Sequence, residues 1–122
     1  MNSHGRYFAP ANDPARLVLS GDYSPDGALQ VVTAALRAAA GDARTVLVDG
    51  SRSRLTRPPT VIDCHYAGGC IARADAGLAK VAFVVPEPCL ASLAFLFTVA
   101  MNRGLRVASF GDEAQALEWL GG

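Results

Sequence analysis

An arginine-rich polar stretch, residues 49–60, directly follows an apolar segment of the chain. It opens at Asp49, carries Arg52, Arg54 and Arg57, and leads to Thr60, where a helix is expected to begin. Forked guanidinium donors beside the free amides of a helix start suit a phosphate or a carboxylate. These residues are therefore candidate ligand- or partner-binding groups. A solvated loop that keeps its arginines for solubility is the plainer alternative.

Thr60 has a second interpretation, because Asp63 follows it at the spacing of a helix capping box. In that role the hydroxyl would accept a hydrogen bond from a backbone amide of the first turn. Alternatively, Thr60 or Ser53 could be phosphorylated, and the chain would then act as a phosphorylation-controlled partner switch. We expect the cap and keep the switch as an alternative function.

Three cysteines, Cys64, Cys70 and Cys89, cannot all pair with one another, so free thiols are expected. Cys89 begins a predicted helix, whose dipole can lower the pKa of a thiol. A small hydrolase that uses Cys89 or Asp49 with His65 is therefore an alternative function, although a buried, unreactive thiol is the plainer one. Cys64 and Cys70 are six residues apart and point to different faces of one helix, so no metal site is expected.

The segment 89–101 is apolar on every side of the helix that it is expected to form. Such a helix must be covered on both faces, and a domain of this size has few layers with which to cover it. We therefore expect a homodimer interface or an apolar ligand groove here. The residues expected to face sideways or outward are Leu90, Phe95 and Val99, and those expected to face the sheet are Leu93, Leu96, Phe97 and Ala100.

A glycine pair, Gly68-Gly69, interrupts the helix expected over residues 60–74 and weakens it by about 1 kcal/mol per glycine relative to alanine. Close packing of that helix is the first explanation. Backbone left accessible to a ligand is the second, and in that case neighbouring Tyr66 would line a pocket.

Alternating strands and helices would position these residues. Turn-forming residues 10–14 separate two short extended segments, which predicts an antiparallel edge hairpin. Ser24 and Pro25 mark the start of a helix that Gly41 ends. Apolar β-branched runs predict buried parallel strands, and ligands bind at the carboxyl ends of such strands. The expected strands cover residues 6–9, 16–19, 45–48, 80–85 and 105–110, and the further expected helices cover 60–74, 89–102 and the residues from 112 onward.

The composition narrows the class of protein. The chain has 122 residues, 51% of them hydrophobic, with 11 basic against 11 acidic side chains. It should form a single domain, residues 1–122. A net charge of zero excludes a strongly basic nucleic-acid-binding surface. The longest apolar run is shorter than the roughly 20 residues of a membrane span, and residues 1–6 lack the apolar core of a secretory signal. We expect a cytoplasmic protein that needs no cofactor.

The order of elements, together with four local phrases, resembles the SpoIIAA-like group of the STAS superfamily (sulfate transporter and anti-sigma-factor antagonist domains). The phrases are residues 19–23 (Leu-Ser-Gly-Asp-Tyr), 46–49 (Val-Leu-Val-Asp), 80–85 (Lys-Val-Ala-Phe-Val-Val) and the C-terminal 110–120. The resemblance implies an α/β domain with a mostly parallel sheet of about five strands, an N-terminal antiparallel edge hairpin and four flanking helices. Regulatory members carry a phosphorylated serine in an Asp-Ser-Ser-type motif, and no Asp-Ser pair stands in the equivalent stretch here.

The resemblance also implies that the chain does not catalyse a reaction, because members of this group mostly bind partner proteins, nucleotides or apolar ligands. We expect a homodimeric binding or regulatory module for a protein partner or a small apolar or anionic ligand. The candidate site residues are Asp49, Arg52, Arg54, Arg57, Thr60, Tyr66, Cys89 and Phe95.

Overall fold

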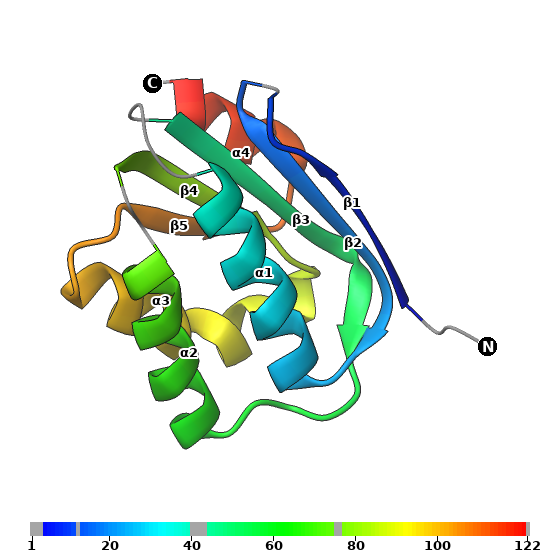
Figure 1. Ribbon diagram of the computed structural model, residues 1–122. Helices are drawn as coiled ribbons and strands as arrows, with labels where there is room; N and C mark the ends of the chain where they lie inside the picture. Colours follow the sequence, from blue (N-terminus) through cyan, green and yellow to red (C-terminus); the bar gives the residue numbers. More distant parts are fainter. Residues whose placement is uncertain (1–3, 12, 40–43, 75–76, 122) are drawn as a thin grey trace.

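The computed structural model describes residues 4–11, 13–39, 44–74 and 77–121, and they form one mixed sheet with helices on both faces (Figure 1). The five strands follow one another across the sheet in sequence order. The elements are β1 (His4–Ala9), β2 (Ala15–Tyr23), α1 (Pro25–Ala39), β3 (Arg44–Leu55), α2 (Val61–Ala74), β4 (Leu78–Val84), the short 3₁₀ helix η1 (Glu87–Cys89), α3 (Leu90–Asn102), β5 (Val107–Phe110) and α4 (Glu113–Gly121).

The N-terminal hairpin is the antiparallel edge of this sheet, as expected. β1 and β2 pair antiparallel, with Tyr7 opposite Val18 and Phe8 opposite Leu17. All later neighbours, β2–β3, β3–β4 and β4–β5, pair parallel. The expected mostly parallel sheet with four flanking helices is therefore confirmed. Gly41, the expected helix stop, lies outside the described residues.

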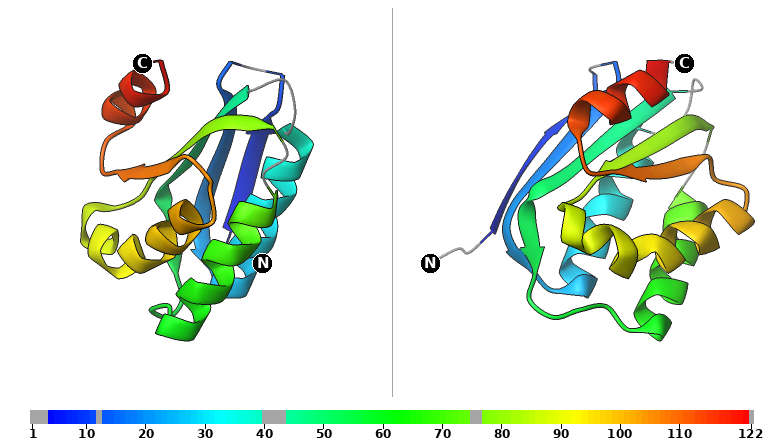
Figure 2. Two further views of the ribbon diagram at one scale, coloured as in Figure 1. Left: turned by 90° about the vertical axis from the view of Figure 1, so that its left-hand side faces the viewer. Right: turned by 180° about the vertical axis from the view of Figure 1, so that it is seen from behind.

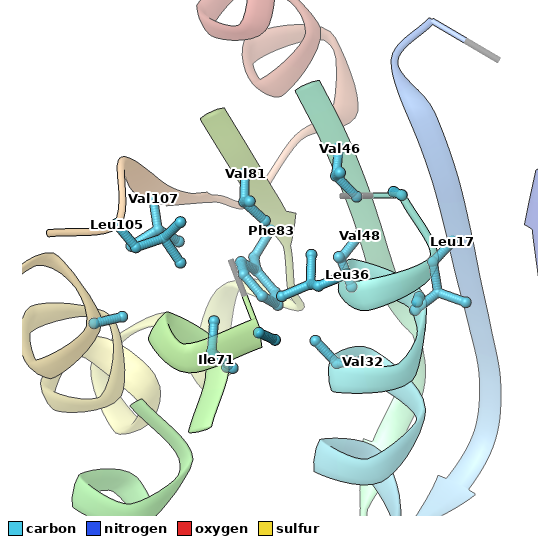
Figure 3. Packing of buried hydrophobic residues seen from close by; sticks show 14 of the residues in the cluster. Leu17, Val32, Leu36, Val46, Val48, Ile71, Val81, Phe83, Leu105 and Val107 are labelled. Carbon is cyan, nitrogen blue, oxygen red and sulfur yellow. The ribbon is translucent and has the colours of Figure 1, made fainter. Parts of the chain in front are cut away.

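The helices divide unequally between the two faces of the sheet (Figure 2). Helices α1, α2 and α3 cover one face, where side chains from the middle strands meet Val32, Leu36 and Ile71 (Figure 3). Helix α4 covers part of the other face, where Leu120 packs with Leu47 of β3. Neighbouring residues of a strand point to opposite faces, so β3 and β4 contribute side chains to the hydrophobic cores on both faces of the sheet. This is why their sequences are continuous apolar runs.

Local signals explain where the helices begin. The hydroxyl of Ser24 accepts a hydrogen bond from the Gly27 amide at 3.0 Å and so caps α1. At the start of α2, the Thr60 hydroxyl accepts from the Asp63 amide at 3.0 Å, and the Asp63 carboxylate accepts from the Thr60 amide at 2.9 Å. The reciprocal capping box expected at Thr60 is thus confirmed.

The arginine-rich stretch is not the loop that the sequence predicted. β3 continues to Leu55, and Arg52 and Arg54 lie in it, opposite Ser20 and Asp22 of β2. Beyond Asp49, β3 has no pairing with β4 and is held by β2 alone. A strand segment that pairs with a neighbour on one side only tolerates polar side chains. Residues 50–55 therefore lack the apolar pattern of a buried strand.

Candidate functional site

An apolar cavity lies between the sheet and helices α1, α2 and α3, at the carboxyl ends of β2, β3 and β4. Its volume is about 140 Å³. Ligands of open parallel sheets bind at this edge, so the cavity is the best-formed candidate site in the described part of the chain. The apolar side chains of its wall include Leu29, Val32, Val48, Ile71, Phe83 and Phe97.

Most polar side chains along the cavity wall already have partners. Ser53 donates its hydroxyl hydrogen to the Gly50 carbonyl at 2.8 Å. Tyr66 shares a side-chain hydrogen bond with Cys70, and this bond is the main cause that raises the pKa of Tyr66. Buried polar groups without partners are costly, and the described side chains contain none. The inner wall is therefore suited to apolar groups.

Arg54 borders the opening of the cavity, but its guanidinium forms an ion pair with Asp22. Its Nε and Nη2 atoms donate to the two carboxylate oxygens of Asp22, at 3.2 and 3.1 Å. Cross-strand partners point to the same face, so Arg52, opposite Ser20, shares this outer face with Arg54 and Asp22. That face is the one opposite the buried Leu19 and Tyr23. The structure therefore places Arg52 and the Arg54 guanidinium away from the cavity.

Asp49 is a buried residue whose carboxylate bonds the backbone of its own strand. Its Oδ1 accepts hydrogen bonds from the Ser51 amide at 3.0 Å and from the Ser51 hydroxyl at 2.7 Å. These bonds lie where the register between β2 and β3 shifts, between Val18 and Ser20. A short side chain that bonds the backbone two residues on stabilises such an irregularity, so a role in holding the bulge is the one that the contacts of Asp49 support.

Arg57 and Asp63 form an ion pair beside the opening. Nη1 of Arg57 donates to Oδ2 of Asp63 at 2.7 Å. This hydrogen bond, followed by the bond from the Thr60 amide, lowers the pKa of Asp63 to about 2. Arg57 is therefore engaged with the start of α2, and Thr60 is engaged in the cap.

Cys89 and Tyr66 line the cavity, as their candidate roles require. Cys89 is half-buried at the start of α3 and makes no side-chain cap hydrogen bond. His65, the base considered for a thiol enzyme, is exposed and is not among the cavity-lining residues.

Within the described residues, no group of three or more His, Cys, Asp or Glu side chains could hold a metal ion.

Helix α3 is covered more completely than the sequence predicted. Val99, expected to face sideways or outward, is buried, because α2 packs on it through Gly68. The close-packing explanation of the glycine pair therefore holds for Gly68. Phe95 remains 44% exposed on α3, and Met101, about a third of a turn around the helix from it, is 49% exposed. None of the described helices is both long and apolar enough to cross a membrane.

Sequence reasoning missed Asp26 and Leu29, which line the cavity from α1. The signal was present, since Ser24 and Pro25 mark a helix start directly after a strand. Helix starts that follow parallel strands lie at the carboxyl edge of the sheet. The first turn of α1 therefore had to lie beside the first turn of α2.

This architecture is the SpoIIAA-like fold. Among solved structures, the chain is similar to an uncharacterized protein of the DUF3478 family with a SpoIIAA-like fold from Shewanella loihica PV-4. The similarity covers 98% of this chain and 95% of that chain, with a TM-score of 0.52 and 15% sequence identity. No family model matches the chain, and no curated protein matches it either. The resemblance found in the sequence is thus confirmed for the fold.

Proposed function

We propose that this protein is a non-enzymatic binding module that holds a small apolar molecule in the cavity between the sheet and helices α1 to α3. The observation that carries the proposal is the cavity itself, about 140 Å³ in volume and walled by aliphatic and aromatic side chains at the ligand-binding edge of the sheet. Cavities of this size and lining, such as an engineered one of about 150 Å³, stay dry and take up benzene.

Binding of toluene tests the proposal. A ligand that binds only the folded state raises the free energy of unfolding by RT ln(1 + [L]/Kd). We expect toluene to raise the melting temperature of the wild-type protein, and the rise should follow the logarithm of the toluene concentration once that concentration exceeds Kd. Ala28 lines the cavity, so Ala28→Leu should fill part of it and remove the effect.

The matched control is Ala114→Leu, at an exposed position of α4 on the other side of the sheet. This variant should keep the full response to toluene. If toluene leaves the wild-type melting temperature unchanged, or if Ala28→Leu responds as strongly as Ala114→Leu, the proposed function is wrong.

We also propose that the module is a homodimer that pairs through the outer side of α3. Phe95, a large apolar side chain that is 44% exposed, supports this interface. Light scattering at micromolar concentration should give twice the 12.7 kDa of one chain. Phe95→Asp should give the monomer mass, while Leu117→Asp, at an exposed position of α4, should keep the dimer. A monomer mass for the wild-type protein would refute this interface.

A further inference from the structure

The charged side chains that line the cavity do not all form ion pairs. Asp63 is paired with Arg57 at 2.7 Å, and Arg54 is paired with Asp22 at 3.0 Å. Asp26, the remaining charged residue of the cavity wall, has no ion-pair partner within the described residues. Among the charged side chains that line the cavity, Asp26 is therefore the one carboxylate without an ion pair.

Asp26 belongs to the first turn of α1 and lines the cavity together with Asp63 of the first turn of α2. Two pKa shifts support this placement. The pKa of Arg57 is raised first by its hydrogen bond with Asp63 and also by the charge of Asp26. The pKa of Tyr66 is raised first by its hydrogen bond with Cys70; the charge of Arg73 lowers it, and the charge of Asp26 raises it by less than Arg73 lowers it. Asp26 thus adds negative potential at the entrance.

The interior imposes a different requirement from the opening. An unpaired charge inside an apolar cavity loses its hydration without compensation, so a charged group of a bound molecule has to stay at the rim. The apolar body of that molecule fills the interior, where a volume of about 140 Å³ accommodates a single ring or a short branched chain. The bound molecule is therefore amphiphilic, with its two ends in different surroundings.

We propose that the cavity selects a small apolar molecule with a cationic amine at one end, an inference that rests on the proposed function. The Asp26 carboxylate binds the amine at the opening. Molecules of the same size with a carboxylate in that place are repelled by the unpaired charge. The expected preference is thus opposite in sign to the anionic ligand suggested by the arginine-rich sequence, because those arginines are paired or face outward.

Three probes of nearly equal size test this selectivity by titration calorimetry at pH 7: toluene, benzylamine and benzoate. We expect benzylamine to bind about two- to fivefold more tightly than toluene, the gain of a partly exposed ion pair, and benzoate to bind more weakly than toluene. Asp26→Asn should remove the preference for benzylamine and leave the affinity for toluene unchanged. The control variant is Glu118→Gln, an exposed acid of α4, which should keep the preference.

A salt series on the wild-type protein gives a second measurement that depends on no variant. The preference for benzylamine over toluene should fall toward one at 1 M NaCl, where the Debye length is about 3 Å. If toluene binds but benzylamine and benzoate bind equally, or if Asp26→Asn keeps the preference, the selectivity is wrong and the proposed apolar site stands. If toluene does not bind, the site itself is refuted, and the selectivity with it.

Discussion

Gly68 of α2 lies directly against Val99 of α3. A Cβ atom added to Gly68 would lie 2.7 Å from Val99 Cβ and 2.6 Å from the backbone oxygen of Leu96. Real Cβ atoms do not approach other atoms so closely, and a helix backbone cannot move aside as a side chain can. The two helices touch here because one of them carries no side chain. Since α2 and α3 form two walls of the cavity, this contact also sets its width.

Gly68→Ala should therefore destabilise the protein, although alanine is the better helix former. We expect a loss of about 1–3 kcal/mol in the free energy of unfolding, the cost of overpacking a close contact, measured by urea denaturation. Gly69→Ala is the control, because the nearest atom to its added Cβ is the Arg73 Nη1, at 3.4 Å. That variant should be neutral or more stable, by up to about 1 kcal/mol. Equal stabilities for the two variants would contradict the contact.

The capping box at the start of α2 predicts a second stability effect. Thr60→Ala leaves the Asp63 amide without its 3.0 Å acceptor, and the expected loss is about 1 kcal/mol. Thr56→Ala, at an exposed position before the helix, should change the melting temperature little. Equal melting temperatures for these two variants would show that the cap contributes nothing.

Asp63 also makes stability depend on pH. Its pKa is lowered from 3.8 to about 2 in the folded protein, so its contribution is complete above the unfolded value and is lost as the pH falls through the folded value. Asp63→Asn should be less stable than the wild-type protein at pH 7. The difference should shrink between pH 4 and pH 2, when urea denaturation is repeated at each pH. A difference that is constant across this range would rule out the ion pair with Arg57.

The three cysteines should differ in reactivity. Burial, and then the charge of Asp63, raises the pKa of the Cys64 thiol, and this thiol is buried, whereas Cys70 and Cys89 are half-buried. Because the thiolate is the reactive form, iodoacetamide at pH 8 should label Cys70 and Cys89 well before Cys64. Peptide mass spectrometry resolves the three sites. Labelling of Cys64 at the rate of Cys70 would contradict the packing of α2 on α3.

The elements with strong local signals could be predicted from the sequence. The hydroxyl side chains of Ser24 and Thr60 can cap a helix, so each residue marks a helix start in the sequence. The apolar, β-branched run at 45–48 is typical of a buried strand. The end of β3 could not be predicted in this way. Residues 52–55 are extended because β2 pairs with them, and a polar segment gives no sign of a partner that is distant in the chain.

The candidate site was predictable in position and not in chemistry. Parallel strands place ligands at their carboxyl edge, and Tyr66 and Cys89, which the sequence singles out, line the cavity there. Whether a charge at that edge is available depends on its neighbours. Asp22 engages Arg54 across 32 positions of the sequence, a proximity that only the folded chain reveals. Asp63 engages Arg57 only six positions away, but a nearby acid in the sequence does not show that the ion pair forms.

The register shift between β2 and β3 determines which side of the sheet the arginines occupy. Val18 pairs with Asp49 but Ser20 pairs with Arg52, so β3 holds one extra residue there. Because side chains alternate with a period of two, a regular strand running from Asp49 would point Arg52 and Arg54 toward the cavity, and the extra residue taken up at the bulge returns them to the outer face. Ligand preference in this domain thus depends partly on one backbone irregularity. Straightening the strand with every residue kept would bring the two arginines to the cavity side, whereas deleting residue 50 or 51 would leave Arg52 opposite Ser20.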